Sequence, residues 1–378
     1  MEKGNDQIVC KSVWHINRIN SNLGEIDEKI LEKFVETLRQ CRRMILSAEG
    51  RSESGLLIGI KGIKKRTFAQ GDSSFQWRDI TEAAKDLNRK RGTTVLLINS
   101  QSGDTTSPKE MAKDLRAFIN ETGSKKFVIC CVTAHTDSEV AKNSDIVLQL
   151  KGPEEGKEKE GKEKQGSSGI KEIMGDVFEL GSTLLFYGIK KGVNNGLNAK
   201  KILALLKKEM KAVGNLIDNY LKSNHYNEMV NEIAENIKII FGGKGPDQEV
   251  AKMTAIRTKH VVNMLGREAY IAGPLAPAPQ PGIIITLISW SGETKPTIEW
   301  CNDYGSRGAK VFSIVGTRNS TLYEKSKSYV LEAPVEKFYF RAAFLLSPLP
   351  GGVMEKFKRC GIKIPDEMLR TLGHSRTE

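Results

Sequence analysis

The 378-residue chain is 39% hydrophobic, enough to build a large core, and its length favours two domains over one. It has no run of about 18 apolar residues and opens on the polar stretch MEKGNDQIVC, so we expect neither a transmembrane span nor a signal peptide, and a cytoplasmic protein with no membrane partner. The net charge of +12 favours an anionic small ligand over nucleic acid, because only 7% of residues are aromatic and no basic run is interleaved with aromatics.

The first half of the chain alternates short Val- and Ile-rich runs with longer helical patterns, which is typical of a parallel sheet covered by helices. The predicted strands of this first series are RMILSA at 43–48, TTVLLIN at 93–99, KFVICCVT at 126–133 and DIVLQL at 145–150. After them, residues 151–169 are punctuated by glycine, mixed in charge and almost free of apolar side chains. That composition predicts a solvated loop. Because the loop leaves the end of a strand, a flap near a site is the functional alternative.

A second series of strands follows a long helical pattern at 199–221, whose apolar residues recur with a helical period. We expect this helix to end the first domain or to bridge to the second. The strands of the second series are predicted at 237–242, 267–273, 282–289, 309–316 and 328–333. The two series are a repeat, since Thr105 and Thr294 stand 189 positions apart and so do Ser102 and Ser291. A repeat of this size indicates duplicated domains.

The six cysteines form no CxxC pair and no Cys/His spacing of the kind that binds zinc. Cys130 and Cys131 lie inside the predicted strand 126–133, so we interpret them as reduced core residues. The sequence predicts no metal and no organic cofactor.

The stretch SQSGDT at 100–105 follows a strand and precedes a helical pattern. Ser100, Ser102 and Thr105 offer hydroxyl groups, and Gly103 lets the backbone come close to a ligand. The first amides of the following helix point outward and favour an anion, so the stretch predicts a phosphate cradle. The alternative is a Ser/Thr helix cap that binds nothing.

A glycine turn after the first strand supports the cradle. Gly50, Arg51 and Ser52 lead from that strand into a helix, which allows Ser52 to face the same pocket from a neighbouring strand.

The second half carries counterparts of both motifs, with differences. SWSGET at 289–294 repeats the hydroxyls as Ser289, Ser291 and Thr294, while Gly245 matches the turn glycine. However, Asp247 stands at the position of the turn serine, and Trp290 replaces Gln101. A carboxylate beside a phosphate disfavours binding unless one of them is neutralised. The second site is therefore expected to be altered or vestigial.

The pairing of Gly-Arg-Ser at 50–52 with Ser-x-Ser-Gly-acid-Thr at 100–105 resembles the sugar isomerase (SIS) domain family. The resemblance occurs once in each half and together covers nearly the whole chain. The resemblance implies an α/β protein of two SIS domains, each a five-stranded parallel sheet flanked by helices in three layers. We place the domains at 1–222, with a core of about 40–195, and at 223–378, with a core of about 235–350. It further implies a sugar-phosphate ligand held by the Ser/Thr motif, and a homodimer or higher oligomer.

Within that family, the hexulose-phosphate isomerases are similar at MGDVFELGSTLLFYGI, residues 174–189, where a Phe-Glu pair opens a helix. The match implies that Glu179 is the catalytic base of an aldose–ketose isomerisation through an enediol, in which one carboxylate carries a proton between adjacent carbons. The phosphate would be held by Gly50, Ser52, Ser100, Gln101, Ser102 and Thr105.

Glu179 and His135, the two candidate catalytic residues, each also have a purely structural interpretation. Glu179 also suits a helix N-terminus, where the dipole favours an acid. His135 follows the strand 126–133 and can serve as the acid/base group for ring opening, although an exposed loop histidine is the simpler interpretation.

Other functions stay open at this stage. The counterpart of Phe178-Glu179 in the second half is Phe340-Arg341, which supplies no base, so a non-catalytic sugar-phosphate sensor is one alternative. An amino-sugar-phosphate deaminase or deglycase is another. Two-domain relatives of that kind use a Glu and a His-Gly-Pro of the second domain and a C-terminal lysine, whereas this chain has His260 and Pro277 near those places and a tail, TLGHSRTE, without lysine. Amide transfer is disfavoured, since we see no glutaminase domain before the repeat.

Overall fold

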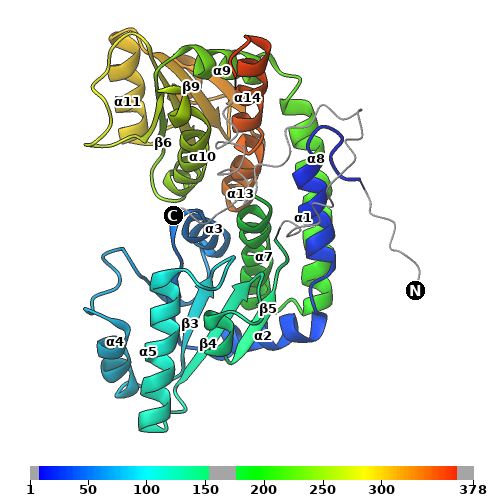
Figure 1. The fold of residues 1–378 in the computed structure, drawn as a ribbon, viewed down its shortest axis with the longest axis vertical. Helices are drawn as coiled ribbons and strands as arrows, with labels where there is room; N and C mark the ends of the chain where they lie inside the picture. Colours follow the sequence, from blue (N-terminus) through cyan, green and yellow to red (C-terminus); the bar gives the residue numbers. More distant parts are fainter. Residues whose placement is uncertain (1–7, 153–175, 364–378) are drawn as a thin grey trace. The chain divides into compact units, whose positions relative to one another are not determined.

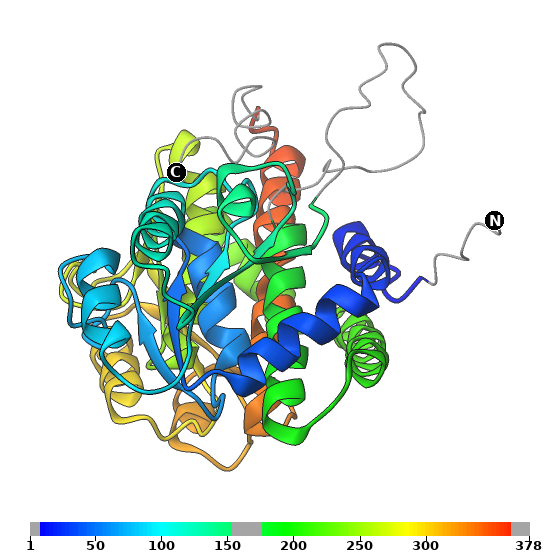
Figure 2. The ribbon, with the colours of Figure 1, turned by 90° about the horizontal axis from the view of Figure 1, so that it is seen from below.

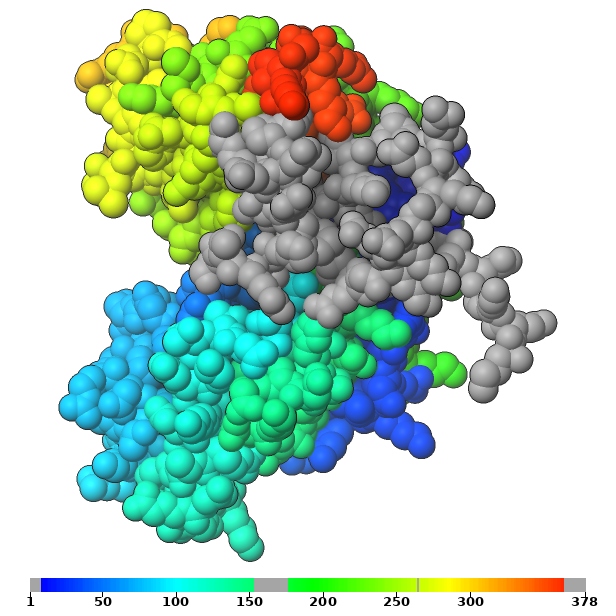
Figure 3. Space-filling view, viewed as in Figure 1, coloured from blue at the N-terminus to red at the C-terminus, as the bar shows by residue number. Residues whose placement is uncertain are grey.

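The computed structural model describes residues 8–152 and 176–363, which are coloured along the sequence in Figure 3. Residues 153–169 of the predicted loop at 151–169 lie outside the described residues, and so does the TLGHSRTE tail.

The chain divides into two compact units. Of the described residues, the N-terminal unit contains 18–152 and 177–209, and the C-terminal unit contains 8–17, Asp176 and 210–363. The units are therefore discontinuous in sequence, whereas the predicted domains are the consecutive ranges 1–222 and 223–378.

Residues 8–17 belong to the C-terminal unit because their backbone is bound there. Asp218 accepts hydrogen bonds from the backbone amides of Lys11 and Ser12 at 3.0 Å each. Gly214 lies so close to the carbonyl of Val9 that a Cβ at that glycine would meet its oxygen at 1.7 Å.

The N-terminal unit is built on one parallel sheet with the order β2-β1-β3-β4-β5. Its strands are β1 (Arg43–Ser47), β2 (Arg66–Ala69), β3 (Thr94–Asn99), β4 (Phe127–Thr133) and β5 (Ile146–Gln149). The prediction of strands at 43–48, 93–99, 126–133 and 145–150 is confirmed to within a residue at each end. β2 was not predicted, because Phe68 and Ala69 are its only apolar residues and do not form an apolar run.

Helices cover both faces of this sheet. They are α1 (Trp14–Gly24, from Arg18 on), α2 (Glu28–Gln40), α3 (Gly50–Ile60), α4 (Ile80–Asn88), α5 (Thr106–Thr122), α6 (Glu139–Lys142), α7 (Asp176–Asn195) and α8 (Ala199–Tyr220, up to Glu209). Figure 2 shows α4 and α5 on one side of the strands and α2 and α7 on the other. The arrangement is the three-layer α/β/α fold that the resemblance implied.

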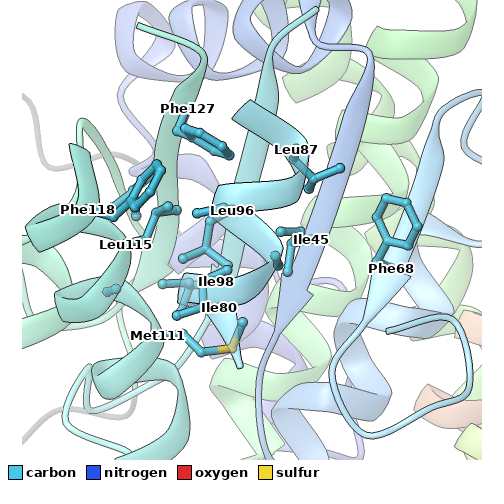
Figure 4. Packing of buried hydrophobic residues seen from close by; sticks show 14 of the residues in the cluster. Ile45, Phe68, Ile80, Leu87, Leu96, Ile98, Met111, Leu115, Phe118 and Phe127 are labelled. Atoms are coloured by element: carbon cyan, nitrogen blue, oxygen red, sulfur yellow. The ribbon is translucent and has the colours of Figure 1, made fainter. Parts of the chain in front are cut away.

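The core on the α4 and α5 side is made of side chains that alternate along the strands. Leu96 and Ile98 of β3 pack with Leu115 and Phe118 of α5, and all four are buried (Figure 4). The helical pattern supplies one apolar stripe and the strands supply one apolar face, which is how a parallel sheet buries both of its surfaces.

The C-terminal unit again combines a sheet, to which β6 and β9 belong, with helices such as α10 and α11 (Figure 1). The order of strands in this sheet is β10-β9-β8-β6-β7. Its strands are β6 (Lys238–Gly242), β7 (Glu268–Ile271), β8 (Ile283–Ser289), β9 (Lys310–Val315) and β10 (Lys327–Val330). Its helices are α9 (Asn224–Glu235), α10 (Pro246–Val262), η1 (Asn263–Leu265), α11 (Lys295–Ser306), α12 (Thr321–Lys325), α13 (Val335–Leu346) and α14 (Leu349–Arg359). All five predicted strands of the second series are confirmed.

In both sheets the first strand of the series lies between the second and the third. The strand order therefore reverses between the first and third strands, and in open α/β sheets the carboxyl ends at such a reversal form the ligand-binding crevice. The two predicted motifs follow these two strands in each unit, so the topology brings them to one place.

Candidate functional site

The turn between β3 and α5 is closed by its own hydroxyl groups. The Ser100 Oγ lies 3.0 Å from the Thr105 Oγ1 and accepts a hydrogen bond of 3.1 Å from the Gly103 amide. The Ser102 Oγ accepts one of 3.2 Å from the Asp104 amide. Gly103 has φ +67°, and a Cβ there would meet the Ser138 Oγ at 2.0 Å, so only glycine fits.

The turn between β8 and α11 has the same geometry. The Ser289 Oγ lies 3.1 Å from the Thr294 Oγ1 and accepts from the Gly292 amide at 3.1 Å, while the Ser291 Oγ accepts from the Glu293 amide at 3.1 Å. Equal spacing in the sequence therefore produces equal turns.

The acidic residue of each motif holds the next loop. The Asp104 Oδ1 accepts from the amide of Glu139, which begins α6, and the Glu293 Oε1 accepts from the amide of Thr321, which begins α12. This acid thus stabilises the loops that surround the turn.

Glu179 is positioned by close packing between α7 and α3. The glycines of α3 allow this approach, since a Cβ at Gly55 would meet the Thr183 Oγ1 at 2.7 Å and one at Gly59 would meet the Phe186 Cβ at 2.5 Å. The Thr183 hydroxyl donates to the Glu179 carbonyl at 2.7 Å.

The side chain of Glu179 forms a buried ion pair with Arg51. The Arg51 Nη2 lies 3.5 Å from the Glu179 Oε1, and each residue exposes only 5% of its surface. No role was predicted for Arg51. The available signal was an arginine between Gly50 and Ser52 at the end of a buried strand, where a charge requires a partner.

Asn99, the last residue of β3, connects this pair to the turn. Its Nδ2 donates to the carbonyl of Ser52 at 2.8 Å and to the Ser182 Oγ at 3.1 Å, and the Ser182 hydroxyl donates to the Glu179 carbonyl at 3.1 Å. Asn99 is fully buried and directly precedes Ser100. Hydrogen bonds therefore join the first turn of α3 and the end of β3 to the helix that carries Glu179.

Gln101 and His135 lie in adjoining loops at the same edge. The carbonyl of Gln101 accepts from the Ala134 amide at 3.0 Å and from the Thr133 Oγ1 at 3.1 Å. The buried Gln101 Oε1 has no hydrogen-bond partner among the described residues. His135 is half-buried, and its backbone amide donates to the Thr133 Oγ1 at 3.3 Å. The structure thus places both residues beside the turn, and their roles stay predictions.

An acidic residue outside the predicted motif also reaches this turn. The Glu49 Oε1 accepts a hydrogen bond of 2.9 Å from the amide of Ser107 in the first turn of α5. The N-cap residue Thr105 makes no side-chain cap bond, so the exposed Glu49 carboxylate satisfies a helix amide that an incoming phosphate would otherwise use.

In the C-terminal unit, Asp247 of α10 lies beside the backbone of Trp290, which is in the turn after β8. It is 6% exposed, and burial raises its pKa to about 8, against a smaller opposing effect of the Trp290 backbone N–H. Its Oδ1 has no hydrogen-bond partner among the described residues. Gly245, with φ +60°, precedes α10 and turns the chain so that Asp247 falls in the first turn of that helix.

His225 is surrounded by aromatic side chains. Its ring lies 5.4 Å from that of Phe312 and 5.9 Å from that of Tyr220, and burial lowers its pKa to about 4. It is a neutral residue of an aromatic cluster of the C-terminal unit.

Among residues 8–152 and 176–363, no group of three or more His, Cys, Asp and Glu side chains is suited to hold a metal ion. None of the helices in these ranges has the length and apolar character that crossing a membrane requires.

No family model and no curated protein matches the chain. Solved structures do match it, over most of its length. They include the C-terminal domain of glucosamine-fructose-6-phosphate aminotransferase from Francisella tularensis, with 15% identity over 90% of this chain and 93% of that one and a TM-score of 0.56. Tagatose-6-phosphate ketose/aldose isomerase from Escherichia coli shares 14% identity over 91% and 92%, with a TM-score of 0.57.

Glucosamine-6-phosphate deaminase from Thermotoga maritima is similar as well, with 16% identity over 93% of this chain and 94% of that one and a TM-score of 0.50. At such identities the similarity shows the fold. The chain has the fold of tandem sugar isomerase domains, as the resemblance of its motifs predicted.

Proposed function

We propose that the chain binds a sugar phosphate at the carboxyl edge of the N-terminal sheet and interconverts its aldose and ketose forms. In this proposal Ser52, Ser100, Gln101, Ser102 and Thr105 hold the phosphate, with Gly50 allowing close approach. The observation that carries the proposal is the buried pair of Arg51 and Glu179, joined through Asn99 to the Ser/Thr turn.

Glu179 would act as the base. A guanidinium beside a carboxylate favours the ionised form, which is the form that accepts a proton. The carboxylate would remove a proton from C2 of the aldose, leave an enediol, and return the proton to C1 to give the ketose. Arg51 would stabilise the negative charge that develops on the sugar oxygens during that transfer. His135 would supply the proton exchange that opens the ring.

The comparisons support the ligand class. The three proteins named above are a tagatose-6-phosphate ketose/aldose isomerase, a glucosamine-6-phosphate deaminase and the C-terminal domain of a glucosamine-fructose-6-phosphate aminotransferase. Each of these names contains a sugar phosphate, and all three proteins share this chain's fold. The net charge of +12 also favours an anionic ligand. Assembly into a homodimer or higher oligomer stays a prediction.

The proposal is tested by following deuterium incorporation at C1 and C2 of aldose and ketose phosphates in deuterated water by NMR. The unmodified chain should catalyse exchange, and Glu179→Gln should slow it by about a hundredfold or more, because a general base supplies that much. Glu110→Gln removes the same charge from an exposed position on α5 and should leave the rate unchanged.

Exchange that survives Glu179→Gln would remove Glu179 as the base. Binding of the sugar phosphate without any exchange would instead support a non-catalytic sensor. The buried Asp247 favours that second function, since it stands where the N-terminal unit has Ser52 and so leaves the two turns unequal. Release of ammonia from an amino-sugar phosphate would indicate a deaminase.

A further inference from the structure

A cavity with basic walls lies at the opposite edge of the N-terminal sheet. Its volume is about 460 Å³. The residues that line it are Arg42, Arg43, Arg66, Lys90 and Arg91. Arg43 begins β1, Arg66 begins β2, and Lys90 and Arg91 precede β3. Because parallel strands begin at the same edge, three separate basic stretches of the sequence are brought together here.

The positive charge of this amino-edge pocket is poorly balanced. No acidic residue lines it, and among the described residues only Lys90 of the five pairs with a carboxylate, that of Asp86 at 2.7 Å. Like charges held together in this way repel, and the repulsion costs stability unless an anion joins them.

Arg43 lies deepest in this cluster. It exposes 5% of its surface, its Nη1 donates to the Thr94 Oγ1 at 3.3 Å, and its Nη2 donates to the carbonyl of Arg91. Burial, and then the charges of Arg42 and Arg66, lower the pKa of Arg43, while Asp86 has a smaller opposite effect. These two hydrogen bonds fix the guanidinium in place without neutralising it.

We propose that the amino-edge pocket binds a small molecule that carries two or more linked phosphoryl groups. Arginine forks pair with phosphate oxygens through two parallel hydrogen bonds, and four of the five cations are arginines. A single phosphoryl group carries a charge of about −2 at most and would leave about two of the four arginine charges uncompensated. The volume lies in the range of small-molecule sites.

The residues that line the pocket indicate which part of the ligand it recognises. None of the five lining residues is aromatic, so the pocket lacks the stacking platforms that single-stranded nucleic acid uses. The recognised feature is therefore the polyphosphate group.

This pocket is separate from the candidate sugar-phosphate site. The two lie at opposite ends of β1, whose five residues span roughly 17 Å. Polyphosphate binding does not depend on the isomerase proposal, and either can fail alone.

The inference is tested by isothermal titration of the full chain with tripolyphosphate, ATP and adenosine. Tripolyphosphate and ATP should both bind, with an affinity that falls as salt rises, and adenosine should not. Arg66→Gln combined with Arg91→Gln should weaken both by about tenfold or more, because two charge-assisted contacts are lost. Both positions are exposed, so the fold should persist.

The matched control is Lys207→Gln with Lys208→Gln, which removes two charges from exposed positions on α8 and should leave the affinity unchanged. Arg42→Gln, a third exposed position, gives an independent variant of the pocket. Equal losses in the control and in the pocket variants would overturn the proposal, and so would the absence of binding to the unmodified chain. Binding of ATP without tripolyphosphate, or a strong preference for single-stranded RNA, would overturn it as well.

Discussion

Glu49 and Asp247 each place a carboxylate at one of the two Ser/Thr turns, but in different states. Glu49 is exposed and bound to the Ser107 amide, whereas Asp247 is buried, with a pKa raised by burial to about 8. An exposed carboxylate repels a phosphate through water, while a buried acid with this raised pKa is mostly protonated and neutral.

Glu49→Gln should therefore strengthen sugar-phosphate binding at the first turn. Removing one nearby negative charge relieves repulsion of about 1 kcal/mol at an exposed site, which corresponds to roughly fivefold tighter binding. The gain should shrink as salt rises, because the interaction is screened. Titration calorimetry at two salt concentrations measures both effects.

The control for that variant is Glu121→Gln, which removes the same charge from the far end of α5. A weaker affinity in Glu49→Gln would show that Glu49 orders the turn instead of competing with the ligand.

At the scale of elements, the pairing of α3 with α7 decides where Glu179 lies. Gly55 and Gly59 stand four residues apart on one face of α3, and neither position has room for a Cβ against α7. Helices that meet at glycines approach closely, so the Arg51 side chain at the start of α3 meets Glu179 near the start of α7.

Gly59→Ala should destabilise the protein by about 1–3 kcal/mol. The new methyl group would meet the Phe186 Cβ at 2.5 Å and the Thr183 carbonyl oxygen at 2.6 Å, and that crowding outweighs the helix propensity gained, at most about 1 kcal/mol. Urea unfolding measures the difference.

Gly24→Ala is the comparison, because a Cβ at Gly24 meets nothing within 4 Å. We expect that variant to be neutral or slightly stabilised. If Gly59→Ala is as stable as Gly24→Ala, the two helices do not depend on glycine for their contact.

The strands show how far element prediction can go from sequence. Of the ten strands in the described residues, nine were expected from apolar runs, and the central ones have such runs because they are buried on both faces. β2 was missed because Phe68 and Ala69 are its only apolar residues, too few to form an apolar run.

For the whole molecule, two kinds of group that burial affects, histidines and an aspartate, shape the dependence of stability on pH. Burial lowers the pKa of His15 from 6.5, so its contribution is lost as pH falls below 6.5. The pKa of His225 is lowered to about 4 from 6.5, so its contribution is lost as pH falls from 6.5 to 4. The pKa of Asp247 is raised to about 8 from 3.8, so its contribution is lost as pH rises from 3.8 to 8. The two effects oppose each other between about pH 4 and 6.5, and above that range Asp247 acts alone.

Asp247→Asn should therefore change the shape of the stability profile. The unmodified chain should lose unfolding free energy between pH 6.5 and 8, by up to about 1.4 kcal/mol per pH unit, and the variant should not. Between pH 4 and 6.5 the variant should gain stability with rising pH, because His225 and His15, whose pKa values burial lowers, still titrate there. Urea unfolding at several pH values gives the profile, and parallel profiles for the two proteins would contradict the assignment.

The sequence by itself determined the features that depend on neighbours in the chain. The Ser100, Gly103 and Thr105 contacts join residues within five positions, so the same motif builds the same turn at Ser289 and Thr294. The repeated series of apolar runs likewise determined two parallel sheets, because each run needs burial on both faces.

Only the tertiary structure decided which distant residues meet. Arg51 and Glu179 lie 128 positions apart, and the basic pocket combines side chains at the amino ends of β1, β2 and β3, which helices and loops separate in the sequence. Such contacts depend on strand order and helix packing, and the physical reason is that a local pattern fixes which face of an element is buried but not which element covers it.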